Sequence, residues 1–169
     1  MYWMVQKQVP LYGIIMIRPW RGSKITTTIK KRGIEMVSFT EDMKKMIGEQ
    51  LCMIATCSGD NLPNIGPKRS GRVYNDHQII WNENTNKQII KDIRNGSKVA
   101  IAVVDWPKLK GFRFVGTAEI FEEGSEPYKD CEEKAPSLRM GKPKLAVVFT
   151  CEKIYSLDSG ANAGELLAE

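Results

Sequence analysis

The sequence predicts a mainly β protein, a six-stranded antiparallel β-barrel with few helices. Six apolar or β-branched segments are separated by turns or by short polar stretches. The turn sequences SGDN and NDH follow the first two segments at residues 58–61 and 75–77, and short turns of this kind join antiparallel hairpins. The helical patterns are too few and too short for alternating βαβ units, so a barrel is the better prediction.

Glycine and proline mark irregular positions in two of the expected strands. The six strands are predicted at residues 51–57, 63–74, 78–82, 98–105, 112–122 and 144–156. In the second strand, Gly66 and Pro67 indicate a bulge or an edge position, because proline has no N–H for the ladder. In the fifth strand, Gly116 indicates a bulge.

Short helices are predicted before the first strand and around the strand at 78–82. Ser38 and Glu41 form a capping box that predicts a helix over 39–47, with Gly48 after its end. The polar, acidic stretch 123–137 predicts another helix. A third begins after the strand at 78–82 and is described with the candidate site below.

The charge of the chain is concentrated at its N-terminus. The net charge is +5, yet residues 1–35 carry +6 and residues 36–169 carry −1. The body of the protein is therefore nearly neutral, and the basic composition does not indicate nucleic acid as a partner. No apolar run approaches the roughly 20 residues of a membrane span, so we expect no membrane association.

This asymmetry suggests three parts. Residues 1–35 are expected to be an N-terminal extension, either a disordered basic arm or a mis-assigned start that precedes the natural initiator Met36. Residues 36–158 form the barrel domain. Residues 159–169 begin with the small residues SGANAG and form a C-terminal tail.

Several kinds of active site lack support in the sequence. The four cysteines have no metal-ligand spacing and His77 is the only histidine, so no metal site is expected. A lone histidine in a polar turn argues against Ser-His-Asp catalysis. Neither a G-x-G-x-x-G fingerprint nor a P-loop is present. Cysteines that stay reduced fit a cytoplasmic protein.

Cations and a helix start come together within about 25 residues. Lys68 lies in the second strand, where strand alternation places it on one face with Ser70 and places Arg69 on the other, unless a bulge at Gly66 and Pro67 disturbs the pattern. Thr85 opens the capping box TNKQ, which predicts a helix start with free N–H groups beside Lys87. Such a cluster suits a phosphate, although cations pointing into water are the alternative interpretation.

The ordered set of segments resembles a known family. The segments are LCMIATCSGDNLPN, GPKRS, WNENTNKQ, KVAIAVVD and FRFVGTAEIF, and they cover about residues 39–157. Together they resemble the pyridoxamine 5′-phosphate oxidase-like family of FMN-binding split barrels, in particular its short single-domain members. The resemblance implies a homodimer with FMN at the subunit interface. It also implies a set of FMN-binding residues: Pro67, Lys68, Arg69, Ser70, Asn82, Asn84, Thr85, Lys87 and Gln88.

The resemblance leaves the reaction open. A bound flavin performs hydride or electron transfer itself, so the lack of catalytic side chains does not argue against an FMN-dependent oxidoreductase acting on a small molecule. The alternatives are a non-enzymatic FMN-binding or electron-transfer protein, and a split barrel that uses deazaflavin or haem. The chain ends in SGANAGELLAE, without the basic and histidine-containing segment that reads the pyridoxal substrate, so we do not expect oxidation of pyridoxamine phosphate itself.

Overall fold

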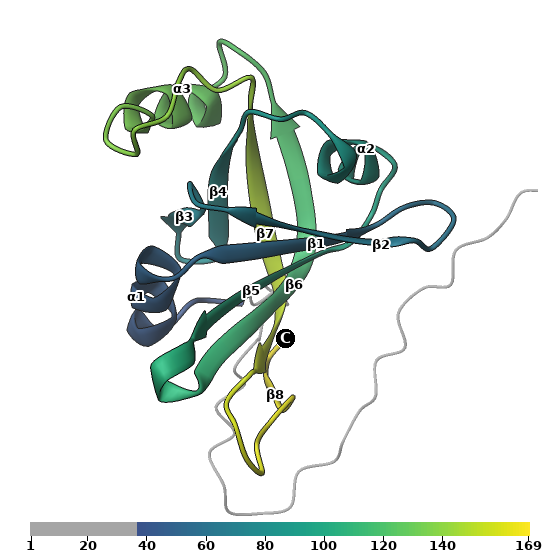
Figure 1. The fold of residues 1–169 in the computed structure, drawn as a ribbon, viewed down its shortest axis with the longest axis vertical. Coiled ribbons are helices and arrows are strands. Elements are labelled where there is room, and N and C mark those ends of the chain that lie inside the picture. Colours follow the sequence, from purple (N-terminus) through teal and green to yellow (C-terminus); the bar gives the residue numbers. More distant parts are fainter. Residues whose placement is uncertain (1–36) are drawn as a thin grey trace, which may run out of the picture. The chain divides into compact units, whose positions relative to one another are not determined.

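The computed structural model describes residues 37–169, and the predicted extension at 1–35 and the predicted start at Met36 lie outside the described residues. The described part is a mainly antiparallel β structure with three α-helices (Figure 1). Its strands are β1 Cys52–Cys57, β2 Pro63–Lys68, β3 Arg72–Asn75, β4 Gln78–Glu83, β5 Val99–Asp105, β6 Lys110–Phe121, β7 Leu145–Ser156 and β8 Leu166–Ala168. The predicted split-barrel class is confirmed.

The sheet is open between its two edge strands. The strands follow the order β2-β1-β5-β6-β7-β4-β3, and β8 pairs with the part of β7 that β4 leaves free. The edge strands β2 and β3 are consecutive in the chain and are joined by only three residues, so the sheet must curl until its edges approach each other. Because no ladder joins β2 to β3 in the described residues, the barrel remains split at this point.

The number of strands differs from the six predicted. The single strand expected at 63–74 is divided into β2 and β3 by a turn at residues 69–71, and β8 lies in the predicted tail. The register between β1 and β2 runs without a shift from Cys57↔Pro63 to Cys52↔Lys68. Of the two alternatives for Gly66 and Pro67, the edge position is therefore correct and the bulge is absent.

The first helix begins later than predicted. Helix α1 spans Glu41–Glu49, and its N-cap is Thr40, whose hydroxyl accepts a 3.3 Å hydrogen bond from the Met43 N–H. The predicted capping box at Ser38 is therefore wrong by two residues, and Gly48 lies inside the helix. Met43 and Ile47 are buried on the face that packs against the sheet.

The other two helices are shorter than the sequence suggests. Helix α2 spans Gln88–Arg94 and follows β4, and helix α3 spans Glu126–Lys134 with Ser125 at its N-cap position. Buried isoleucines of α2, Ile89, Ile90 and Ile93, join the main core inside the sheet. Helix α3 covers β4 and β7 on their other face through a second apolar cluster around Tyr128 and Cys131.

Gly116 lies at a β-bulge, as predicted. The register of β6 against β7 shifts between Val115 and Gly116. A Cβ atom on Gly116 would lie 1.9 Å from the Thr150 carbonyl oxygen, a separation that no side chain can adopt without moving the backbone of β7. Glycine is therefore required where the two longest strands pack most closely.

We expect Gly116→Ala to lower the free energy of unfolding by at least about 2 kcal/mol, because the clash is with backbone rather than with a flexible side chain. Urea denaturation measures the change. Gly48→Ala is the matched control, since a Cβ on this helical glycine meets nothing within 4 Å. The control should raise the unfolding free energy by about 0.5–1 kcal/mol, and an equal loss in both variants would contradict the proposed backbone clash.

Candidate functional site

The predicted site lies where the barrel is split, at the turn between β4 and α2. Glu83, the last residue of β4, is fully buried. Its carboxylate accepts hydrogen bonds from the Thr85 N–H at 2.7 Å, the Thr85 hydroxyl at 2.6 Å and the Asn86 N–H at 3.0 Å. The Lys68 ammonium group, at the end of β2, forms an ion pair with the same carboxylate. Glu83 therefore connects the edge strand β2 to the strand–helix turn.

The ionised form of Glu83 is stabilised despite its burial. Burial alone raises the pKa of the carboxyl group. The Lys68 ammonium and the donors of Thr85 and Asn86 oppose this effect, and together they hold the pKa below its ordinary value. The group is thus a charged carboxylate near neutral pH, and its charge is compensated by Lys68.

The predicted capping box of the second helix is wrong. Thr85 lies three residues before α2, and its N–H and hydroxyl are bonded to Glu83. The N-cap position belongs to Lys87, whose side chain makes no capping hydrogen bond. Asn86 adopts a positive φ of 51°, so the chain turns sharply before α2 begins. A buried carboxylate from the preceding strand, rather than a capping hydroxyl, organises this turn.

Ser70 and Asn82 form a second connection across the split. The Ser70 hydroxyl bonds to the Asn82 carbonyl at 3.2 Å and accepts from the Asn82 N–H at 3.0 Å, and both residues are buried. The Asn82 side chain donates to the Cys131 carbonyl at 2.8 Å and accepts from Arg72 at 3.1 Å. Arg72 also forms an ion pair with Asp130 of α3. These two predicted site residues therefore join β3, β4 and α3.

The remaining predicted residues are accessible. Arg69 lies in the turn after β2, where strand alternation does not apply; it is exposed and donates to the Leu138 carbonyl. Pro67 is exposed on β2. Lys87 is exposed and has no hydrogen-bond or ion-pair partner within residues 37–169. Of the three predicted cations, Arg69 in the β2–β3 turn and Lys87 at the β4–α2 turn are therefore exposed, whereas Lys68 is paired with Glu83.

Asn84 carries an unsatisfied buried acceptor. Its side-chain oxygen is shielded from solvent and has no hydrogen-bond donor among the described residues. Leaving such an acceptor unpaired costs on the order of 1–3 kcal/mol. A ligand hydroxyl or N–H that reached this turn would satisfy it, so Asn84 fits the predicted cofactor.

The sequence analysis missed a second buried carboxylate beside the turn. Asp92 of α2 is fully buried, and it accepts hydrogen bonds from the Thr56 hydroxyl of β1 at 2.6 Å and from the Gln88 side chain at 2.7 Å. The contact with Thr56 anchors α2 to the sheet, and the contact with Gln88 holds the side-chain amide of this predicted site residue. In the sequence, Asp92 has the pattern of an exposed polar residue on a helix. The one signal for its contact with Gln88 was that the two residues are four positions apart, a spacing that places them on the same face of a helix.

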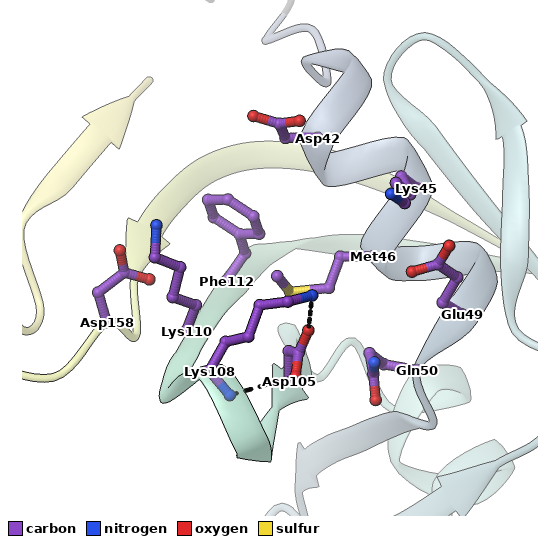
Figure 2. Close-up of a pocket in the computed structure, with 10 residues that line it drawn as sticks. All are labelled: Asp42, Lys45, Met46, Glu49, Gln50, Asp105, Lys108, Lys110, Phe112 and Asp158. Carbon is purple, nitrogen blue, oxygen red and sulfur yellow. Dashed lines mark hydrogen bonds and ion pairs between the residues drawn. The ribbon is translucent and has the colours of Figure 1, made fainter.

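A charged pocket lies elsewhere in the fold. It has a volume of about 260 Å³ between α1, the 3₁₀ turn Trp106–Lys108, β6 and the loop after β7 (Figure 2). Phe112 and Met46 are its apolar lining residues, and Lys108 forms an ion pair with Asp105 at 2.6 Å. None of the predicted site residues lines this pocket. The candidate site at the split of the barrel and this charged pocket are therefore separate.

Other classes of site find no support in the described residues. Within residues 37–169 no group of three or more His, Cys, Asp or Glu side chains is arranged to hold a metal ion. All four cysteines are unbridged, and burial raises the pKa of the Cys52 and Cys151 thiols to about 12, so neither is a reactive thiolate. Among the helices of the described residues, none has the length and apolarity required to cross a membrane.

Comparison with known proteins identifies the family of this chain. The pyridoxamine 5′-phosphate oxidase family model matches residues 39–158, which include the whole strand–turn–helix segment. The chain belongs to the pyridoxamine 5′-phosphate oxidase family. Membership of this family establishes the fold, and it leaves the reaction open.

Three similar proteins illustrate the range of the family. The crystal structure of HupZ from Group A Streptococcus is 47% identical, covers 75% of this chain and 99% of that chain, and has a TM-score of 0.68. An uncharacterized protein of Methanocaldococcus jannaschii is 34% identical over 140 residues, which is 81% of this chain and 93% of that protein. An FMN-binding protein from Syntrophomonas wolfei is 16% identical, covers 72% of this chain and 87% of that chain, and has a TM-score of 0.62, a likeness that supports the fold alone.

We expect Thr56→Val to lower the free energy of unfolding by about 2 kcal/mol, because it leaves the buried Asp92 carboxylate with one fewer donor. Thermal or urea unfolding measures the change. Thr117→Val on β6 is the matched control, since Thr117 is exposed and makes no side-chain hydrogen bond in the described residues. The control should change stability by less than about 0.5 kcal/mol, and similar losses in the two variants would show that the contact with Asp92 is unimportant.

Proposed function

We propose that the protein is an FMN-binding flavoprotein and that FMN binds at the β4–α2 turn. The observation that carries this proposal is the buried, unpaired side-chain oxygen of Asn84, located at the strand exit of a chain that belongs to the pyridoxamine 5′-phosphate oxidase family. Lys87 supports it as an exposed cation without a partner two residues after Thr85. An anion beside Lys87 would turn this unpaired charge into a charge-assisted hydrogen bond.

The predicted site residues divide into two groups under this proposal. Lys87, Asn84 and the side-chain oxygen of Gln88 are available to contact FMN, with Lys87 assigned to the phosphate, and Arg69 could contact it only by leaving the Leu138 carbonyl. Lys68, Ser70, Asn82 and Thr85 bond mainly within the protein and shape the wall of the site. Pro67 lies on the outer face of β2, where it is available to a partner subunit.

We also propose a homodimer in which the outer sheet face forms the subunit interface. The side chains that point away from the core on adjacent strands are small or apolar: Ile65, Ala55, Ala100 and Val115 form one row across the sheet. Ile65 is 65% exposed. A face of this composition suits close contact with a second copy of the chain.

The proposed activity is that of an FMN-dependent oxidoreductase acting on a small molecule. Bound flavin supplies the hydride or electron transfer, and the protein supplies binding, orientation and exclusion of water. The free cysteines are consistent with the cytoplasmic location expected from the sequence. A non-enzymatic FMN-binding or electron-transfer protein is the second candidate, because the same bound flavin would supply electron transfer in either kind of protein.

An absorption spectrum of the purified protein tests the proposal. We expect a flavin spectrum after purification or after addition of FMN and gel filtration, at one FMN per chain. Steady oxidation of NAD(P)H or another reductant would identify an enzyme, whereas flavin that is reduced chemically without turnover would identify a carrier. A protein that retains no flavin, or that retains deazaflavin or haem instead, would contradict FMN as the cofactor.

Lys87→Ala should weaken FMN binding by at least about tenfold and leave riboflavin binding nearly unchanged, because riboflavin lacks the phosphate that Lys87 is proposed to contact. Fluorescence titration with both ligands measures the two dissociation constants. Lys91→Ala is the control, as it removes the same charge one turn further along α2. Equal losses for FMN and riboflavin would show that Lys87 has no role at the phosphate.

A further inference from the structure

The turn that should receive a phosphate already contains an anion of its own. The Glu83 carboxylate binds four donors: the Lys68 ammonium, the Thr85 N–H, the Thr85 hydroxyl and the Asn86 N–H. A phosphate group would require donors of these same kinds, cations together with N–H and O–H groups. The Glu83 carboxylate therefore already occupies these four donors, and an incoming phosphate must bind to other groups of the turn.

The charges at the turn largely cancel before any ligand binds. Lys68 and Glu83 form a buried pair, with the Lys68 side chain only 11% exposed and the Glu83 side chain completely buried. A pair of this kind contributes little net field to a ligand a few ångströms further out, because its two fields oppose each other. Without Glu83, Lys68 would act as a strong, poorly screened cation next to the ligand.

We propose that the Lys68–Glu83 ion pair acts as a neutral unit that limits the affinity of this turn for a phosphate dianion, and that Lys68 does not contact the phosphate itself. This inference rests on the proposed FMN site. Glu83 is then a positioning residue that determines selectivity through charge, since it holds Thr85 and Asn86 in place and cancels Lys68. The phosphate contact falls to Lys87, whose side chain has no partner in the described residues.

Burial explains why removing one member of this ion pair would have a large effect on selectivity. Removing one member of a buried pair leaves the other as an uncompensated charge in a medium that screens poorly. The remaining charge then acts on a ligand phosphate but leaves an uncharged ligand nearly unaffected. The ratio of riboflavin to FMN dissociation constants isolates this electrostatic effect, because the two ligands share the ring and the ribityl chain.

A double-mutant cycle on the two residues tests the inference. Titrations at pH 8 keep the phosphate of FMN doubly ionised, as its second pKa is about 6. Glu83→Gln should raise the preference for FMN over riboflavin about tenfold, and Lys68→Met should lower it about tenfold. The double variant, which removes the pair as a unit, should return the preference to within about threefold of the wild type.

The double variant separates the inference from direct contact between Lys68 and the phosphate. If Lys68 contacts the phosphate, the double variant will lose the preference for FMN as severely as Lys68→Met alone, and the inference is wrong. A preference that Glu83→Gln leaves unchanged would also overturn it. If Glu83→Gln fails to fold, comparing the double variant with Lys68→Met still separates the two interpretations, because only the ion-pair interpretation expects the double variant to recover the preference for FMN.

Inorganic phosphate provides a second probe that needs no flavin. Chemical shifts of the backbone amides at residues 85–88 report its binding to the apo protein. We expect phosphate to bind more tightly to Glu83→Gln than to the wild type, and equal binding would contradict the inference. A wild-type protein that binds neither FMN nor riboflavin would refute the proposed function, while the phosphate titration would still decide the role of the ion pair.

Discussion

The buried ion pair between Lys68 and Glu83 is the contact on which the candidate site depends. The sheet order leaves β2 and β3 as separate edges, so no β-ladder closes the barrel between them. Side chains close it instead, through Lys68 with Glu83 and Ser70 with Asn82. The same Glu83 carboxylate fixes the turn that leads into α2. Closure of the barrel and the shape of the candidate binding turn are therefore set by one buried charge.

A second buried carboxylate supports the opposite side of the turn. Asp92 connects α2 to β1 through Thr56 and holds the side chain of Gln88. The turn is thus held at both ends by carboxylates, one at the strand exit and one in the helix. Between these two ends, the buried side-chain oxygen of Asn84 and the exposed ammonium group of Lys87 have no hydrogen-bond partner among the described residues. A preorganised turn with unpaired polar groups is what a ligand requires.

The overall fold could be predicted because it follows from local patterns. Buried runs such as Cys52–Cys57 predict strands, and Gly116 predicts a bulge because a close backbone approach excludes every other residue. Two errors have a common cause. Ser38 and Thr40 are both acceptable N-caps, and Thr85 with Gln88 satisfies a capping pattern, so local sequence alone cannot choose between alternatives that tertiary contacts decide.

The missed parts of the site are residues whose burial the sequence does not reveal. Glu83 follows Asn82 in a polar segment whose composition predicts a solvent-exposed turn, yet the Glu83 side chain is completely buried. Asp92 reads as the outer face of a short helix and is buried as well. In both cases the partner lies far away in the sequence, on β2 or β1, so the pairing appears only when the strands are assembled. Which of the predicted site residues bond mainly within the protein could therefore not be predicted from the sequence.

The most direct test of the account is the location of bound flavin. Backbone amide chemical shifts recorded during titration of the full chain with FMN report which residues change environment. The account predicts the largest changes at residues 84–88 and in the turn at 69–71, with saturation at one FMN per chain. Changes concentrated instead around the charged pocket between α1 and β6, with residues 84–88 unaffected, would contradict it.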